Sequence, residues 1–373
     1  MIDPLTSAGS LSCGRLYGAF GVDFSSLGAE GASAAAVAAV AMRRVCARLP
    51  EVGITAFCPA VRAHELPPGD VHRLLERLAA PKYASTGVDP PGARILGVHL
   101  DGPFFSREYA PATGPLPHLK ESFEEGALNA TLGAIKPGVR LVTLAPELPG
   151  ALEAIRQLTS EGVVVGLGRT AAGLARCEEA VQAGARLVSH VCSHMPPFHH
   201  RDPGPIGLLA ERELAPPHTE LGAAHNDKAP TGGGSVFFSL AVAGQHQSTI
   251  NLTHSTHPDG LILLSCRRSL IFAEPPPKAQ DDAEPVPLDG TLLTCARRLW
   301  HCSGSADPAA ALLCGSAHPA SLLGLTAKGT LRPGADADLL LLDPQSLEVR
   351  ACYVRGKLTW ADEALHGAFW FHV

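Results

Sequence analysis

The densest set of chemically active side chains lies in the stretch LVSHVCSHMPPFHHRDPG, residues 187 to 204. It contains His190, His194, His199, His200, Arg201 and Asp202. Imidazole is the commonest metal ligand and the side chain closest to neutrality at cellular pH, so such a cluster can bind a metal, an anion or a sugar. Loop histidines are more often solvated or capping residues, so the stretch taken alone leaves both interpretations open.

The elements that must position this cluster form a repeating pattern. Val188 and Val191 flank His190, and Pro196 and Pro197 forbid continuation, which places His190 at the end of a buried strand. Strands are predicted at 53–61, 93–100, 139–147, 162–170, 185–191, 236–242 and 260–266, with 16–22 as a candidate eighth. Helices are predicted at 33–49, 71–78, 123–135, 150–159, 171–183 and 308–322. Buried strands alternating with helices predict a parallel sheet, and eight such units close an α/β barrel of the TIM-like (β/α)₈ type.

Polar side chains gather where these strands end, which is where barrels carry their chemistry. The residues at these positions are Asp101, Glu147, Arg169, His190, His246 and Cys266. Asp101 also fits a helix N-cap or a turn before Gly102 and Pro103, and strand-end position alone does not separate these interpretations.

Composition limits the partners. The chain has 373 residues, a net charge of −6 and no basic block, so nucleic acid and anionic membranes are not expected partners and small molecules are. Its start lacks a basic region followed by an apolar core, and no apolar run is long enough to span a bilayer. Ten cysteines without CxxC pairs indicate free thiols, so we expect a cytoplasmic protein.

Three regions are expected along the chain. Residues 1–19 lack a periodic pattern and predict a loose lead-in, and residues 20–325 form the barrel. The segments 216–235 and 274–287 are polar and rich in Pro or Gly, which predicts flexible insertions. Residues 326–373 show the alternation of small antiparallel strands and predict a residual β-sandwich piece.

Taken together, the motifs resemble the N-acetylglucosamine-6-phosphate deacetylase family of the amidohydrolase superfamily. The resemblance covers most of the chain from Gly18 to Trp360. Its matching segments, in order, are GAFGVDFS, GVHLDGPFFSRE, VTLAPE, GLGRT, SHVCSHMPPFHHRDPG, HPDGLILL and KGTLRPGADADLLLLD. The resemblance implies a distorted (β/α)₈ barrel with a small β-sandwich, a homodimer, and a divalent metal such as zinc held by one Glu and two His. The metal would activate a water that removes the acetyl group of N-acetylglucosamine-6-phosphate.

Carried onto this chain, the metal-ligand positions are altered. Asp101 stands at the position of the family's metal Glu, Arg169 at that of the first metal His, and His190 at that of the second. A guanidinium stays protonated and offers only donors, so Arg169 cannot ligate a cation. We therefore hypothesise an ion pair between Arg169 and Asp101 that replaces the metal, and a wide separation of the two would contradict it. Glu147 is a candidate for a further oxygen ligand if the pocket rearranges.

Other positions of the resemblance are altered too. The general base, usually Asp, falls on Cys266, which is better suited to a small buried hydrophobe than to proton transfer. Ser193 and His194 take the substrate-contacting positions usually held by Asn and Ala, and a substrate-facing His falls near Thr113.

The phosphate-side positions are retained. They are Arg201, whose planar donors suit a sugar phosphate, and His246, which the resemblance places across a dimer interface. The segment SLSCGRLYGA replaces the strands that family members carry before this point, so we expect a divergent, N-terminally shortened member. Its tail strands at 339–360 would then lack partners.

Two functions follow. The motif order favours a metal-dependent deacetylase of amino-sugar catabolism. Asp101, Arg169 and Cys266 favour a catalytically impaired pseudoenzyme that binds sugar phosphate or dimerises with an active relative.

Overall fold

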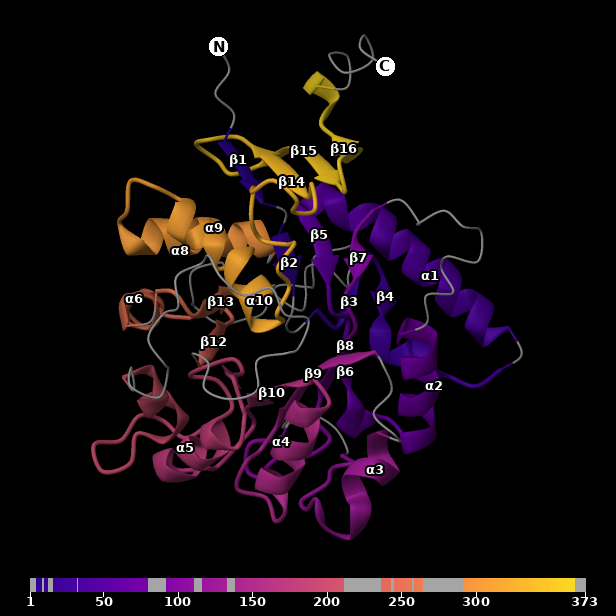
Figure 1. Cartoon of the computed structure of the whole chain (residues 1–373), viewed down its shortest axis with the longest axis vertical. Coiled ribbons are helices and arrows are strands. Elements are labelled where there is room, and N and C mark those ends of the chain that lie inside the picture. Colours follow the sequence, from indigo (N-terminus) through magenta and orange to yellow (C-terminus); the bar gives the residue numbers. More distant parts are fainter. Residues whose placement is uncertain are drawn as a thin grey trace, which may run out of the picture.

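The computed structural model describes residues 5–8, 10–12, 16–31, 33–79, 92–110, 116–132, 138–210, 236–242, 245–256, 258–263 and 291–365. Helices and strands alternate through most of these ranges, and the first and last described strands lie on the same side of the molecule (Figure 1). The two predicted insertions, 216–235 and 274–287, lie outside the described residues.

The central element is a curled parallel sheet of seven strands, in the order β13-β12-β11-β10-β9-β8-β6. Their bounds are β6 Ala60–Arg62, β8 Val98–Asp101, β9 Val139–Leu144, β10 Val164–Leu167, β11 Leu187–Val188, β12 Phe237–Leu240 and β13 Leu261–Leu263. All neighbours run parallel, so the carboxyl ends of the strands meet at one edge of the sheet. The predicted barrel architecture is confirmed.

Helices lie around the periphery of this sheet (Figure 1). They are α1 Ala34–Arg48, α2 Pro68–Ala79, α3 Ala127–Leu132, α4 Ala151–Ser160, α5 Leu174–Gln182 and α6 Gln247–Thr256. Helix α4 shows why: Ala151, Ala154, Ile155 and Leu158 recur at helical spacing and form its buried face. Three further helices, α8 Leu292–Ser303, α9 Ala309–Leu313 and α10 Ala317–Leu322, precede the tail. Within the described ranges, no helix is long and apolar enough to cross a membrane.

A second sheet joins the two ends of the chain. Strand β1 (Leu5–Ala8) pairs antiparallel with β14 (Leu339–Leu342), which continues to β15 (Val349–Val354) and β16 (Lys357–Ala361). Figure 1 shows indigo β1 beside these yellow strands. The expectation that the tail strands lack partners was wrong, because the backbone of residues 5–8 supplies the missing edge.

Two further short strand pairings involve described residues near the start of the chain. Strand β2 (Ser10–Ser12) pairs parallel with β5 (Ile54–Phe57), which also pairs with β7 (Arg94–Ile95). Residues 16–22, the candidate eighth barrel strand, do not join the parallel sheet. They contribute to an antiparallel pair of β3 (Gly18–Ala19) and β4 (Val22–Asp23), because Phe20 and Gly21 adopt left-handed backbone angles that turn the chain.

Candidate functional site

Asp101 lies at the last position of β8 and is only 2% exposed. Its Oδ2 accepts a hydrogen bond from the Tyr17 hydroxyl and lies 3.7 Å from Nε of Arg169. The hypothesised Asp101–Arg169 ion pair is therefore confirmed as a contact between two buried side chains. A buried carboxylate needs such partners, because desolvation without them is costly.

Arg169 follows β10 by two residues and is held from both sides. Its backbone is left-handed, with φ +52°, and its carbonyl accepts a hydrogen bond from the amide of Ser106 at 2.9 Å. Next in the chain, the Thr170 hydroxyl and the Ala171 amide both donate to the Glu147 carboxylate. Each Glu147 oxygen thus accepts a hydrogen bond from this loop. Glu147 therefore fixes the two residues that follow Arg169.

His64 lies next to Asp101 and is fully buried. Its Nδ1 is 3.2 Å from the carbonyl oxygen of Asp101, and its ring centroid is 5.4 Å from that of Phe105. Burial lowers the pKa of His64, and the nearby charge of Asp101 opposes that effect only in part. At neutral pH the imidazole is therefore uncharged. We refer to Tyr17, His64, Asp101 and Arg169 as the strand-tip cluster.

Arg62 borders the strand-tip cluster at the end of β6, in register with Asp101. Its guanidinium binds Asp23 at 2.7 Å and Glu65 at 2.6 Å, and its Cζ lies 5.3 Å from the centre of the Tyr17 ring. Burial lowers the pKa of Arg62, but the two carboxylates outweigh it and raise the pKa overall. Sequence reasoning missed Tyr17, His64 and Arg62; the available signal was that His64 and Arg62 follow an apolar strand.

His190 lies two residues after β11, is 2% exposed and adopts φ +45°. Its amide donates to the Ser239 hydroxyl at 2.7 Å, and its ring lies against Gly168, where an added Cβ would come within 2.8 Å of Cε1. A glycine before Arg169 therefore lets the ends of β10 and β11 approach closely. The sequence-predicted strand-end position of His190 is confirmed.

The loop that follows His190 is more exposed. The ring of His194 lies 5.5 Å from that of His190, and the Ser193 hydroxyl accepts a hydrogen bond from Gln245 at 3.2 Å. Gln245 directly precedes His246, so this bond ties the two predicted substrate-contacting loops together. His246 is exposed, and its Nδ1 accepts from the Ser248 amide at 3.2 Å.

Asp202 fixes the segment 199–204, which we call the Arg201 loop. Its Oδ1 accepts from the amides of Leu174 and Gly204 at 2.9 and 3.0 Å, and these bonds lower the pKa of Asp202. Arg201 beside it is exposed, and no hydrogen bond or ion pair of its side chain is found among the described residues. The loop therefore holds a rigidly anchored backbone and an available guanidinium.

The side chains at the metal-ligand positions of the resemblance do not suit a divalent cation. Of the three positions that the resemblance gives to metal ligands, Arg169 has no lone pair to offer, and the Asp101 carboxylate is already bound by Arg169 and Tyr17. Across the described ranges there is no group of three or more His, Cys, Asp or Glu arranged to hold a metal. A metal at this point would have to displace a buried cation.

Two predicted site residues, Thr113 and Cys266, lie outside the described residues.

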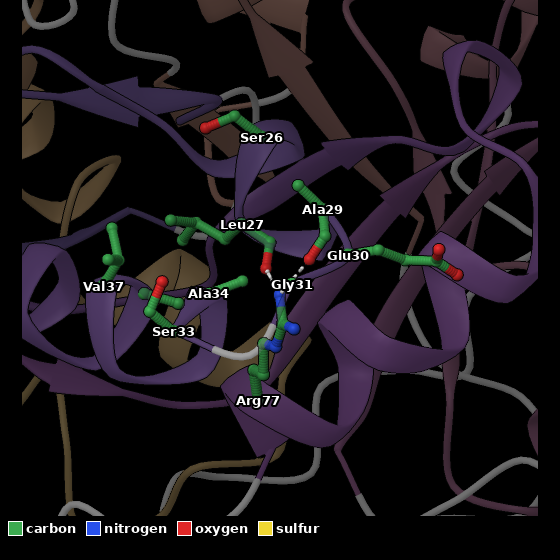
Figure 2. A pocket seen from close by; sticks show the side chains of 10 residues that line it. Ser26, Leu27, Ala29, Glu30, Gly31, Ser33, Ala34, Val37 and Arg77 are labelled. Atoms are coloured by element: carbon green, nitrogen blue, oxygen red, sulfur yellow. Dashed lines mark hydrogen bonds between the residues drawn. The ribbon is translucent and has the colours of Figure 1, made fainter.

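A separate pocket lies between α1 and the short helix η1 (Phe24–Gly28), and Arg77 lines one side of it (Figure 2). The guanidinium of Arg77 donates to the carbonyl oxygens of Leu27 and Ala29. None of the predicted site residues lines this pocket.

Comparison with known proteins agrees with the fold. No protein-family model matches the chain. The N-acetylglucosamine-6-phosphate deacetylases of Bos taurus and Homo sapiens are 37% and 36% identical over 94% of this chain and 82% of their own length. A mutant deacetylase of Mycobacterium smegmatis, solved in complex with N-acetyl-D-glucosamine-6-phosphate, has a TM-score of 0.71 at 26% identity, with 95% of this chain and 86% of that one covered.

The curled parallel sheet, together with the antiparallel sheet that joins the two ends of the chain, defines an amidohydrolase-type protein. Within that class, the chain belongs to the N-acetylglucosamine-6-phosphate deacetylase family.

Proposed function

We propose that this chain binds N-acetylglucosamine-6-phosphate at the carboxyl ends of its parallel strands and does not turn it over by the metal-dependent hydrolysis implied by the family. The observation that carries this proposal is the buried contact between Asp101 and Arg169, with Tyr17 bound to the same carboxylate oxygen. Because the chain supplies its own cation at this point, a divalent metal would meet both charge repulsion and an occupied ligand.

The binding half of the proposal rests on the Arg201 loop. Its exposed guanidinium stands on a backbone that Asp202 anchors, and planar paired donors suit a phosphate. We assign Arg201 and His246 to the phosphate, and Ser193 and His194 to the sugar. His246 would act across a homodimer interface, and the free thiols of the described cysteines suit a cytoplasmic protein.

The base position supports the same conclusion. Cys266 takes the place of the general base in the resemblance, and a thiol near neutrality is mostly protonated, so it is a poor shuttle for a leaving amine. With the ligand set and the base both changed, the retained chemistry is recognition of a phosphorylated amino sugar.

The alternative is that the chain is an active deacetylase, as the names of its relatives imply for those proteins. Calorimetric titration with N-acetylglucosamine-6-phosphate and with unphosphorylated N-acetylglucosamine, combined with acetate detection, separates the two. We expect the protein to bind the phosphorylated sugar and not the unphosphorylated one. The amount of acetate released should not exceed that in the protein-free control. Multiple turnovers that are abolished by Asp101→Asn would establish the deacetylase instead.

A further inference from the structure

The guanidinium of Arg169 has unused donors. The residue is 7% exposed, and its Nε and Nη1 are buried without a hydrogen-bond partner among the described residues. The 3.7 Å separation from Asp101 Oδ2 makes an ion pair but exceeds hydrogen-bond length. Buried polar groups in native proteins are almost always hydrogen-bonded, so an unsatisfied cationic donor at a strand end calls for a ligand.

This guanidinium is fixed in place. Its Cζ lies 5.4 Å from the centre of the Phe105 ring, and the Arg169 carbonyl is bound by Ser106. Glu147 holds the two residues that follow it. The donors of Arg169 are therefore preorganised, which lowers the cost of binding an acceptor there.

The chemistry of these donors restricts the ligand group that can meet them. A guanidinium offers donors only and carries a permanent positive charge. A carbonyl or carboxylate oxygen satisfies it, whereas an ammonium group has only donors and the same charge. An N-acetylated hexosamine phosphate has two strong acceptors, the phosphate and the acetamido carbonyl. In the proposed function the phosphate goes to Arg201, which leaves the carbonyl.

We propose that Arg169 is a specificity-determining residue, which donates to the acetamido carbonyl oxygen and so selects N-acylated amino-sugar phosphates over the corresponding free amines. This inference rests on the proposed function. It gives the buried guanidinium of Arg169 a role in binding. The site would bind the acylated sugar phosphate more tightly than the deacetylated one.

The test compares the affinities for N-acetylglucosamine-6-phosphate and glucosamine-6-phosphate, measured by calorimetry on the parent protein and on Arg169→Gln. We expect the parent to prefer the acetylated ligand by about tenfold or more, as for loss of a charge-assisted hydrogen bond. In Arg169→Gln the preference should fall below about threefold or invert, because a neutral amide can also accept from an ammonium. Should this variant not fold, the charge-balanced pair Asp101→Asn with Arg169→Gln replaces it, with the same expectation.

The matched control is Arg107→Gln. It removes an exposed guanidinium that is paired with Glu121, and it should leave the preference unchanged. Equal affinity of the parent for both ligands would overturn the inference while leaving the proposed binding function in place. A preference that survives in the Arg169 variants would do the same. Failure of the parent to bind either sugar phosphate would overturn the proposed function and the inference together.

Discussion

The strand-tip cluster and the Arg201 loop differ in how far their charged side chains are exposed to solvent. In the strand-tip cluster, Asp101 and Arg169 are almost fully buried and face each other. In the Arg201 loop, the guanidinium is exposed and only the backbone is anchored, through Asp202. Charges of the first kind are coupled to folding, because each is desolvated. Charges of the second kind are available to a ligand at little cost in stability.

The largest expected effect comes from breaking the buried pair. Asp101→Asn leaves the Arg169 guanidinium without its counter-charge, which should lower the free energy of unfolding by about 3 to 5 kcal/mol. Urea denaturation measures this. Adding Arg169→Gln removes the stranded charge and should restore most of the loss. A single variant within about 0.5 kcal/mol of the parent would show that the pair is not coupled to folding.

The opposite pattern is expected at Arg201. Arg201→Gln should weaken binding of N-acetylglucosamine-6-phosphate by about 1.5 to 3 kcal/mol, roughly 10- to 150-fold, through loss of charge-assisted bonds to the phosphate. The free energy of unfolding should stay within about 0.5 kcal/mol, because the side chain is exposed. Calorimetry and urea denaturation on the same preparation check both, with Arg107→Gln as control. A large loss of stability would erase the contrast between the two regions.

Removing the Tyr17 hydroxyl sharpens the description of the strand-tip cluster. Tyr17→Phe keeps the ring beside Arg62 but deletes one donor to the Asp101 carboxylate. We expect a loss of about 1 to 2 kcal/mol in the free energy of unfolding, since a buried acceptor loses a partner. The double variant Tyr17→Phe with Asp101→Asn should be less destabilised than the sum of the two single variants. Full additivity would mean that the two side chains do not interact.

The smallest effect is a pH dependence that differs between the regions. The pKa of His64 is lowered in the folded protein from its ordinary value of 6.5, so below that pH the unfolded chain takes up a proton that the folded one does not. Stability should therefore fall as the pH drops from about 6.5, by up to about 1.4 kcal/mol per pH unit. His64→Gln should reduce this slope to the part that comes from His254, whose pKa burial also lowers. Asp202, whose pKa is lowered from 3.8, contributes only in more acidic solution, because its stabilisation is lost as the pH falls through its folded pKa.

The sequence predicted the strand ends and, with them, part of the site. Apolar runs that stop at Asp101 and His190 fix where the chain leaves the sheet, and the donor-only chemistry of Arg169 predicted its ion pair with Asp101. Local patterns do not reveal Tyr17, whose partner Asp101 is 84 positions away. Nor do they reveal β1, a four-residue strand that pairs with β14 at the far end of the chain.

Two helices of the described residues, α6 and α8, were not predicted, and α8 shows a different limit. In α8, Leu292, Cys295, Ala296 and Leu299 form a buried face with clear helical spacing. The helix begins only a few positions after the Pro-rich segment 274–287, whose composition predicts a flexible insertion and not the start of a helix. Composition thus outweighed periodicity where periodicity was the better guide.

The most direct test of the account is the metal content of the purified protein after equilibration with zinc and dialysis, measured by elemental analysis beside Asp101→Asn and Arg169→His. The account predicts well under one equivalent in the parent, no change in Asp101→Asn, and increased binding in Arg169→His, where a lone pair replaces the cation. One equivalent of zinc in the parent that disappears in Asp101→Asn would contradict it, because Asp101 would then be a metal ligand in spite of Arg169.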